Sequence, residues 1–196
     1  RRDHAGFLTT TFTDAGTDIT LINDKGYDAC SYFFPDGKHL IWTSVRDKMG
    51  TSGKLEGDWS DWQHYPQGAE LYISDRQGGH VKRLTNNDYY EAEVTVSPDG
   101  KWIVFGRQIK GNMDLWVMNA DGTGEHQITF TEDWQEGAPY FLPDSNTILF
   151  RAWKASEYGQ RPTPMTIFTI KRDGSGLEPQ THTHEMNWAP YPAPDG

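Results

Sequence analysis

Cysteine is almost missing from this sequence, because Cys30 is the only one among 196 residues. A single thiol excludes an internal disulfide framework, a cysteine-rich metal site and a haem-attachment motif. Long apolar runs are missing too, since none approaches the ~18 residues that a membrane-spanning helix needs. No segment of useful length has a helical hydrophobic period. We therefore expect no membrane span and a fold made of strands.

Positive charge is in short supply, with 18 Lys and Arg against 28 Asp and Glu and a net charge of −10. Such a field repels phosphate backbones, so nucleic acid is not an expected partner. It favours cations, a basic peptide or a basic protein surface. Hydrophobic residues are also few, at 35%, but aromatic residues reach 13%. This balance predicts a globular chain with aromatic-rich packing rather than disorder.

A repeated turn organises the chain. Pro-Asp recurs at Pro35, Pro98, Pro143 and Pro194, at spacings of 63, 45 and 51 residues, and glycine follows except at Ser145. A short segment, such as 91–96 or 136–141, comes before each turn, and after the turn come an alternating run, a second run, a glycine turn and a short closing run. The runs are 39–42, 70–73 and 81–85, then 102–105, 114–117 and 126–129, then 147–150, 166–169 and 177–181. Their β-branched and aromatic residues, bounded by turns, predict four short strands per unit.

Four-stranded units of this length are typical of β-propeller blades. The alternative is a two-sheet sandwich with an accidental repeat, but a turn at the same place in every unit favours the propeller. Propellers close with about four to eight blades, so we expect the ring to be incomplete in this chain. The expected units are a partial blade or N-terminal strands at 1–25, blades at 26–86 (with a long insert at 46–68), 87–130 and 131–182, and the first strand of a further blade at 183–196.

The stretch SPDGKWIVF…MDLWVMNADGTGEHQIT, within residues 97–129, resembles the repeat of TolB-type propellers, bacterial relatives of the WD-repeat family. The likeness covers about residues 26–196. It implies a periplasmic or otherwise extracytoplasmic protein that acts as an interaction domain or as a subunit of a larger assembly. It also leaves an alternative, because the same fold serves enzymes. The chain would then be the propeller of a metal-dependent polysaccharide lyase or of a serine peptidase, with catalytic parts partly outside it.

Blade geometry predicts where acidic residues gather. The loops between the second and third strands share one end of the blades, here called the top face, with the residues seven places before each Pro. Those residues are Asp28, Glu91, Glu136 and Asn187, and Glu93 adds a carboxylate nearby. A ring of carboxylates at the channel entrance would hold a Ca²⁺-like ion, an N-terminal amine or a basic side chain. The alternative is that these are solvated loop residues.

Two top-face loops carry further candidates. The insert 46–68 holds Trp59, Trp62 and Tyr65, and the loop 154–164 holds Tyr158 and Arg161. Aromatic side chains on a loop suit a partner surface or a sugar-stacking surface. The alternative is that they fold back onto the blade as a local core.

His182 and His184 are two residues apart, so on a strand both imidazoles would face one metal ion. Some lyases with TolB-like propellers hold a divalent metal through histidines, and the sequence is similar at that level. The alternative is a polar connecting loop. No cofactor is predicted beyond this open choice of a divalent cation, Ca²⁺ or Mn²⁺. The sequence has no G-x-S-x-G elbow, P-loop or dinucleotide fingerprint, so no catalytic residue is assigned.

Together these features predict a non-catalytic propeller that binds through its top face. The expected partner is a protein or a basic peptide, including other subunits or the remainder of its own propeller. Trp42, Phe105 and Phe150 occupy equivalent strand positions, which predicts that they are core residues rather than a ligand site.

Overall fold

The computed structural model describes residues 10–12, 19–49, 63 and 65–193. They form three antiparallel sheets of four strands each and one two-stranded sheet. The first blade is β3 (Asp28–Phe33), β4 (His39–Ser44), β5 (Glu70–Asp75) and β6 (Lys82–Arg83). The second is β7 (Tyr90–Val96), β8 (Trp102–Ile109), β9 (Asn112–Asn119) and β10 (His126–Gln127). The third is β11 (Trp134–Phe141), β12 (Thr147–Lys154), β13 (Thr166–Lys171) and β14 (Glu178–Pro179), with a 3-10 turn η1 (Ala155–Glu157) after β12, while β1 (Thr10–Phe12) pairs with β2 (Ile19–Leu21).

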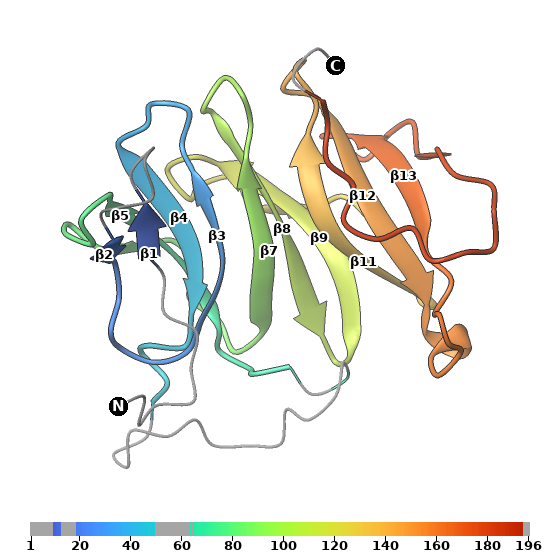
Figure 1. Cartoon of the computed structure of the whole chain (residues 1–196), viewed down its shortest axis with the longest axis horizontal. Coiled ribbons are helices and arrows are strands. Elements are labelled where there is room, and N and C mark those ends of the chain that lie inside the picture. Colours follow the sequence, from blue (N-terminus) through green and yellow to red (C-terminus); the bar gives the residue numbers. More distant parts are fainter. Residues whose placement is uncertain (1–9, 13–18, 50–62, 64, 194–196) are drawn as a thin grey trace.

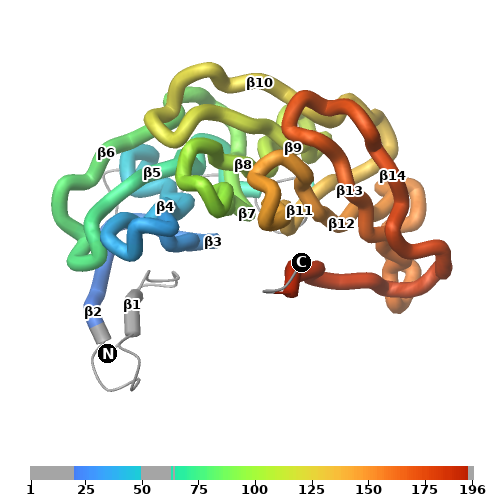
Figure 2. Tube along the Cα trace, turned by 90° about the horizontal axis from the view of Figure 1, so that it is seen from above, coloured from blue at the N-terminus to red at the C-terminus, as the bar shows by residue number. Residues whose placement is uncertain are grey.

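The blades stand side by side along an arc (Figure 2). The strands β3, β7 and β11 lie on its inner side, and β6, β10 and β14 lie on its outer side. Figure 1 looks onto the inner side, with the top face at its lower end, where β8 turns into β9. The architecture confirms the expected all-β propeller of three full blades with further partial ones. Within the described part of the chain, no helix is long and apolar enough to cross a membrane.

The repeated turns take the conformations that their sequence predicts. Gly37 and Gly100 have φ of 64° and 72°, in the left-handed region that glycine tolerates best. Ser145 replaces glycine in the third turn and still takes φ of 55°. The turn aspartates accept backbone N–H groups, as when Asp36 Oδ1 binds the N–H of Lys38 at 2.8 Å. The Pro-Asp-Gly repeat therefore encodes a side-chain-capped turn.

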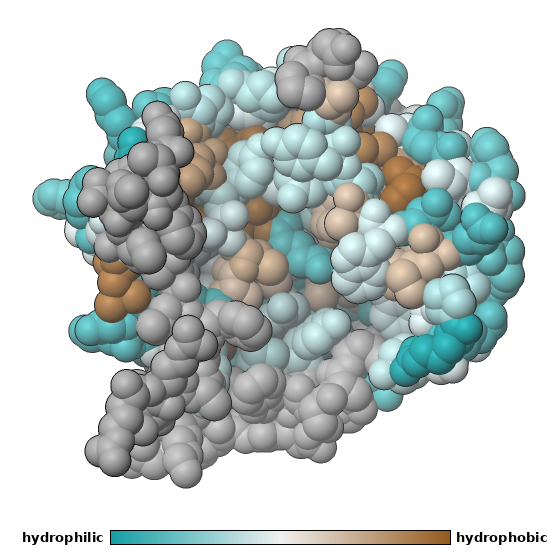
Figure 3. All heavy atoms as spheres, viewed as in Figure 1, coloured by the Kyte–Doolittle hydropathy of each residue, from teal (hydrophilic) through white to brown (hydrophobic). Residues whose placement is uncertain are grey.

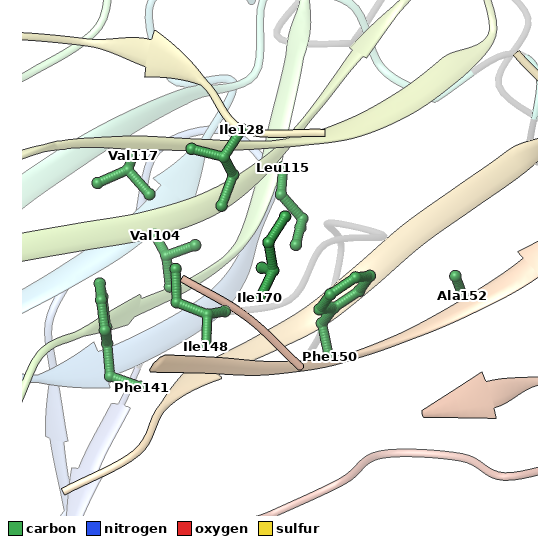
Figure 4. Packing of buried hydrophobic residues seen from close by; sticks show 9 residues of the cluster. All are labelled: Val104, Leu115, Val117, Ile128, Phe141, Ile148, Phe150, Ala152 and Ile170. Carbon is green, nitrogen blue, oxygen red and sulfur yellow. The ribbon is translucent and has the colours of Figure 1, made fainter. Parts of the chain in front are cut away.

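The core lies between the blades. One apolar cluster joins the first and second blades around Ile41, Leu71 and Phe105. A second joins the second and third blades (Figure 4) and contains Val104, Leu115, Val117, Ile128, Phe141, Ile148, Phe150, Ala152 and Ile170. The equivalent residues Trp42, Phe105 and Phe150 are at most 1% exposed, which confirms that they are core residues.

Each inner strand carries a bulge at the same step, five residues before the turn proline. The register shifts around Cys30, Glu93 and Ala138, whose φ values are 41°, 55° and 47°. Ala189 repeats the pattern with φ of 33°. Its own stretch, 183–193, forms no strand among the described residues, although Met186 bridges Met165 as Tyr90 bridges Ala69. Left-handed backbone at non-glycine residues is strained and often marks functional surfaces.

Candidate binding site on the channel wall

The carboxylates expected at the channel entrance are buried. Asp28, Glu91 and Glu136 are 2%, 0% and 3% exposed at the beginnings of β3, β7 and β11. They therefore do not form a ring open to solvent, because each side chain turns into the protein and binds polar groups there. Asp28 accepts hydrogen bonds from Asn23 Nδ2 at 2.8 Å. Asn187, the fourth member, donates from Nδ2 to the Met165 carbonyl oxygen at 2.8 Å.

Glu91 belongs to a polar junction between the first two blades. Asn87, in the connecting segment, donates its backbone N–H to Glu70 Oε1 and its Nδ2–H to Glu91 Oε1, both at 2.7 Å. We call Glu70, Asn87 and Glu91 the first latch. Each of its carboxylates also has a cation, because Arg83 Nη2 binds Glu70 and Arg107 Nε binds Glu91, both at 2.7 Å. Two buried carboxylates are thus balanced by two guanidinium groups.

Glu136 occupies the same place at the next junction. Thr131 donates its backbone N–H to Asp114 Oδ1 at 3.3 Å and its hydroxyl to Glu136 Oε1 at 2.5 Å. We call Asp114, Thr131 and Glu136 the second latch. Burial, followed by the charge of Asp114, raises the pKa of Glu136 to about 8. Its Oε2 is buried and has no hydrogen-bond partner among the described groups.

Glu93 behaves differently from the other predicted acids because the bulge turns it onto the inner side. Its Oε1 pairs with Arg151 Nη2 at 2.8 Å, and its Oε2 accepts the backbone N–H of Ala138 at 2.7 Å. Both partners belong to the third blade, so Glu93 ties the second blade to it. Gly137 makes room for the pair, since a Cβ there would lie 2.1 Å from Glu93 Oε2. Trp188 covers the guanidinium group of Arg151, with the ring centre 4.7 Å away.

Tyrosines lie on the inner side two residues beyond the left-handed residues Cys30, Ala138 and Ala189, whereas β7 has Thr95 at this step. Tyr32, Tyr140 and Tyr191 pack edge to face, with ring centres 6.1 and 5.1 Å apart in that order. Tyr191 is 69% exposed and Trp188 is 60% exposed. We call Tyr32, Glu93, Tyr140, Arg151, Trp188 and Tyr191 the channel wall. Figure 3 shows the inner side hollowed near its middle, with side chains of intermediate hydropathy around the hollow.

Cys30 lies beside this wall, on the bulge of β3, and it is a free cysteine whose residue as a whole is exposed. The thiol accepts the backbone N–H of Glu93. Burial of the sulfur among neighbouring atoms, followed by the charge of Glu93, raises the pKa of Cys30 to about 11. The group is therefore a neutral thiol at physiological pH rather than a reactive thiolate.

Of the aromatic residues predicted on the two top-face loops, the structure describes Tyr65 and Tyr158. Tyr65 stacks on Tyr90 with ring centres 4.7 Å apart, so it folds back onto the blade as the alternative reading of the sequence expected. Trp59 and Trp62 lie outside the described residues. Tyr158 is 52% exposed and packs against Trp153, with ring centres 5.7 Å apart. Arg161 is exposed and donates to the Gln160 carbonyl oxygen at 3.3 Å.

The histidine pair is not assembled into a metal centre here. His182 and His184 are both exposed, and His184 Nε2 lies 3.6 Å from Glu157 Oε1. Within the described ranges, no three His, Cys, Asp or Glu side chains lie close enough together to hold a metal ion. A binding role for these histidines and for the top-face residues stays a prediction.

Four-stranded antiparallel blades with their first strands around a common inner wall define the class, a TolB-like β-propeller present in part. The chain belongs to the family described as the dipeptidyl peptidase IV N-terminal region, whose model matches residues 30–144.

Two curated relatives are similar in sequence. An uncharacterized protein of Agrobacterium fabrum is 24% identical over 166 residues, which cover 80% of this chain and 49% of that protein. Dipeptidyl-peptidase 5 of Porphyromonas gingivalis is 37% identical over 65 residues, 30% of this chain and 9% of that enzyme. The chain thus spans half or less of the length of these relatives.

Solved structures support the fold. A TolB-like protein of Agrobacterium tumefaciens superposes with a TM-score of 0.71 at 20% identity, covering 90% of this chain and 57% of that one. TolB of Acinetobacter baumannii gives 0.67 at 15% identity, covering 89% and 37%. Oligogalacturonate lyase of Vibrio parahaemolyticus gives 0.61 at 13% identity, covering 87% and 46%. At these identities the likeness shows the fold and not the function.

Sequence reasoning missed the tyrosines of the channel wall, although a signal was present. Alignment on the turn prolines puts Tyr32, Tyr140 and Tyr191 at one step, three residues before Pro35, Pro143 and Pro194. The partners in the latches had no such signal, because Asn87 and Thr131 differ in type and stand four and five residues before their carboxylates.

Proposed function

We propose that this chain is part of a propeller that acts as a non-catalytic binding domain, holding a peptide segment of a protein partner against its channel wall. The observation that carries the proposal is the set of exposed rings on a concave inner side, with Tyr191 at 69% and Trp188 at 60% exposure. First strands face the central channel in a closed propeller. Tyr32 on β3 and Tyr140 on β11 would therefore face the channel when further blades complete the ring.

The chemistry of the wall suits a peptide. Phenol hydroxyls both donate and accept hydrogen bonds, so they match backbone N–H and C=O groups, while their rings cover apolar side chains. Tyrosine and tryptophan are also the residues that most often dominate protein recognition. Glu93 and Arg151 neutralise each other at 2.8 Å, so the wall itself adds no net charge from this pair.

The charge of the whole chain sets the preferred partner. A net charge of −10 attracts a basic segment over several ångströms and speeds its encounter with the channel. The TolB-like fold is consistent with a periplasmic or otherwise extracytoplasmic location, which we include in the proposal. The matched part of this chain, with three full blades, covers 49% of the length of the Agrobacterium fabrum relative. A ring of that full length would have about six blades.

The test is a binding measurement on the full-length gene product. Synthetic octapeptides of basic, neutral and acidic composition are titrated against it by fluorescence anisotropy at two salt concentrations. We expect the basic peptides to bind best and to weaken as salt rises. The double change Tyr32→Ala and Tyr140→Ala should weaken binding by about tenfold, as for the loss of central interface aromatics.

Tyr158→Ala is the matched control, because it removes an exposed tyrosine ring from the top face and leaves the channel wall intact. Equal binding by the wild type and the double variant, or loss of binding in the control alone, would refute the channel-wall site. If every variant loses binding and also has a lowered melting temperature, Tyr140→Phe decides, because it keeps the ring and the fold. Binding retained in Tyr140→Phe would support the channel-wall site, and binding lost in a stable Tyr140→Phe protein would assign the contact to the hydroxyl group.

A second candidate function is the propeller domain of a peptidase. It is favoured by membership of the dipeptidyl peptidase IV N-terminal family and by the match to dipeptidyl-peptidase 5. The full-length product would then cleave chromogenic dipeptide substrates, and it would bear a hydrolase segment outside this chain. A lyase with a divalent cation at His182 and His184 would instead show bound Ca²⁺ or Mn²⁺ by elemental analysis, lost on changing both histidines to alanine.

A further inference from the structure

The two blade junctions have the same layout. The first latch places a side chain of the connecting segment between Glu70 and Glu91, and the second places one between Asp114 and Glu136. All four carboxylates are at most 8% exposed. The strand register shows which positions correspond. Glu91 on β7 lies opposite Arg107 on β8, and Glu136 on β11 lies opposite Ala152 on β12, so Glu136 corresponds to Glu91 and Ala152 corresponds to Arg107.

The two junctions differ in their cations. Arg107 opposite Glu91 is replaced by Ala152 opposite Glu136. The second guanidinium is also missing, because Arg83 opposite Tyr72 corresponds to Gln127 opposite Trp116. Two buried carboxylates in the second latch therefore lack the two cations that balance their counterparts. A buried carboxylate without a cation is strongly disfavoured in its ionised form.

At the second junction, apolar groups occupy the place that corresponds to the Arg107 guanidinium group of the first junction. Ala152 is part of the apolar cluster between the second and third blades, and Trp134 and Phe168 pack against that cluster. Their ring centres are 5.4 Å apart. This packing does not suit a hydrated metal ion, which needs several oxygen ligands. A proton is the cation that this site can take.

No other charge compensates Glu136 among the described residues. The ionisable groups on the strands that pack against β11 are Glu91 and Glu93 on β7, Arg107 on β8, Asp114 on β9, and Arg151 and Lys154 on β12. Glu132 and Asp133 lie in the connecting segment and Glu157 lies in η1. Arg107 lies opposite Asp114, but its guanidinium group is bound to Glu91 and Glu125. Arg151 is paired with Glu93, and the Lys154 ammonium lies 5.3 Å from the centre of the Trp134 ring. Asp114 is the neighbour whose charge acts on Glu136, and it opposes ionisation.

We propose that the junction between the second and third blades is a proton-operated latch, closed while the Glu136 carboxyl is neutral and loosened when that carboxyl ionises. In the neutral state Oε1 accepts the Thr131 hydroxyl and Glu136 adds no buried charge to that of Asp114. In the ionised state two anions flank Thr131 in a dry junction, and hydration of Glu136 requires the beginning of β11 to separate from β9. Because Glu93 and Arg151 cross the same junction, its loosening also changes the channel wall.

The titration range supports this device, since the pKa of Glu136 is raised to about 8. An opened junction exposes the carboxyl to water, where its pKa returns to about 4.3. Proton linkage then makes the opening equilibrium rise about tenfold per pH unit between these two values and level off above pH 8. At the first junction the charge of Arg107 opposes the effect of burial on the pKa of Glu91, so the rise should be smaller there.

The experiment measures amide hydrogen exchange of the full-length protein from pH 5 to pH 9, corrected for the intrinsic pH dependence of exchange. We expect protection over 131–137 to fall steeply with pH and protection over 87–93 to fall less. Glu136→Gln, which keeps the size and the acceptor oxygen, should hold 131–137 protected at every pH. Glu91→Gln is the matched change at the first junction and should leave the response of 131–137 unaltered.

Three results would overturn the proposal: the same pH response in the Glu136→Gln protein, an equal response of both junctions, or recovery of protection at pH 9 on adding Ca²⁺ or Na⁺, which would make the site a metal site. If the variant does not fold, the carboxyl ¹³C shift of Glu136 in the wild-type protein decides. A titration midpoint near 4 would overturn the latch, and one near 8 would support it.

Discussion

Removal of Arg107 should be among the most destabilising single changes in this protein. Arg107 binds Glu91, which is 0% exposed, and it also donates from Nη1 to Glu125 Oε1 at 2.7 Å. Arg107→Met keeps much of the apolar volume and deletes the charge. Glu125 is 33% exposed and can be hydrated, but Glu91 is left as a buried charge without a cation. Breaking a buried pair in this way costs about 3–5 kcal/mol.

The loss should depend on pH in a defined direction. Burial raises the pKa of Glu91 above its ordinary value even with Arg107 in place. Without the guanidinium the pKa rises further, because the opposing charge is gone. A raised carboxyl pKa weakens the folded state as pH rises above the unfolded value of about 4.3. Arg107→Met should therefore cost least near pH 4 and most near pH 8.

A double-mutant cycle tests this reasoning. Urea unfolding of the full-length protein, followed by tryptophan fluorescence, gives the free energy of unfolding for wild type, Arg107→Met, Glu91→Gln and the double variant. We expect the double variant to recover about 1–3 kcal/mol relative to the sum of the single changes. A cost below about 1 kcal/mol for Arg107→Met at pH 8, or strictly additive costs, would refute the argument that Glu91 is held by Arg107.

Two further changes test other parts of the structure. Gly137→Ala puts a Cβ 2.1 Å from Glu93 Oε2 and 2.9 Å from Arg151 Nη1, so the pair must move, and the urea midpoint should fall by an equivalent of about 1–3 kcal/mol; an unchanged midpoint would contradict the close packing. At the turns, hydrogen bonding from the backbone N–H of Lys38 and from His39 lowers the pKa of Asp36 to about 2. The stabilisation from the ionised group is therefore present above about pH 4 and lost as pH falls through about 2. Asp36→Asn, which keeps the acceptor oxygen without the charge, should flatten the decline in stability over that range, and an acid denaturation curve as steep as that of the wild type would show that Asp36 contributes nothing to it.

Local sequence was sufficient for the blades because their signals are local. Turn residues such as Asp36 bind backbone groups two residues away, and alternating runs place Trp42 and Phe105 on buried faces. The same reasoning recognised Ser145 as a departure, and the structure shows that serine there takes the left-handed conformation of the glycine it replaces. Each of these features depends on a few neighbouring residues.

The site could be predicted only in part, because alignment locates a residue along a strand but not the direction of its side chain. Glu91 and Glu93 are two residues apart, and alternation alone would put them on one face. The bulge between Ala92 and Thr95 separates their environments, so that Glu91 is buried between blades and Glu93 meets Arg151 on the inner side. A one-residue irregularity in register is invisible to a pattern of alternating residues.

The sequence by itself determined the repeated four-stranded unit, its capped turns and the aromatic core, because these follow from propensity and spacing within about ten residues. Only the tertiary structure decided which charges meet. Arg107 reaches Glu91 across 16 positions and Arg151 reaches Glu93 across 58. Glu91 is buried beside a guanidinium group that lies far away in the sequence, so it forms an ion pair. Glu136 is buried without such a cation, which leaves it to be neutralised by a proton.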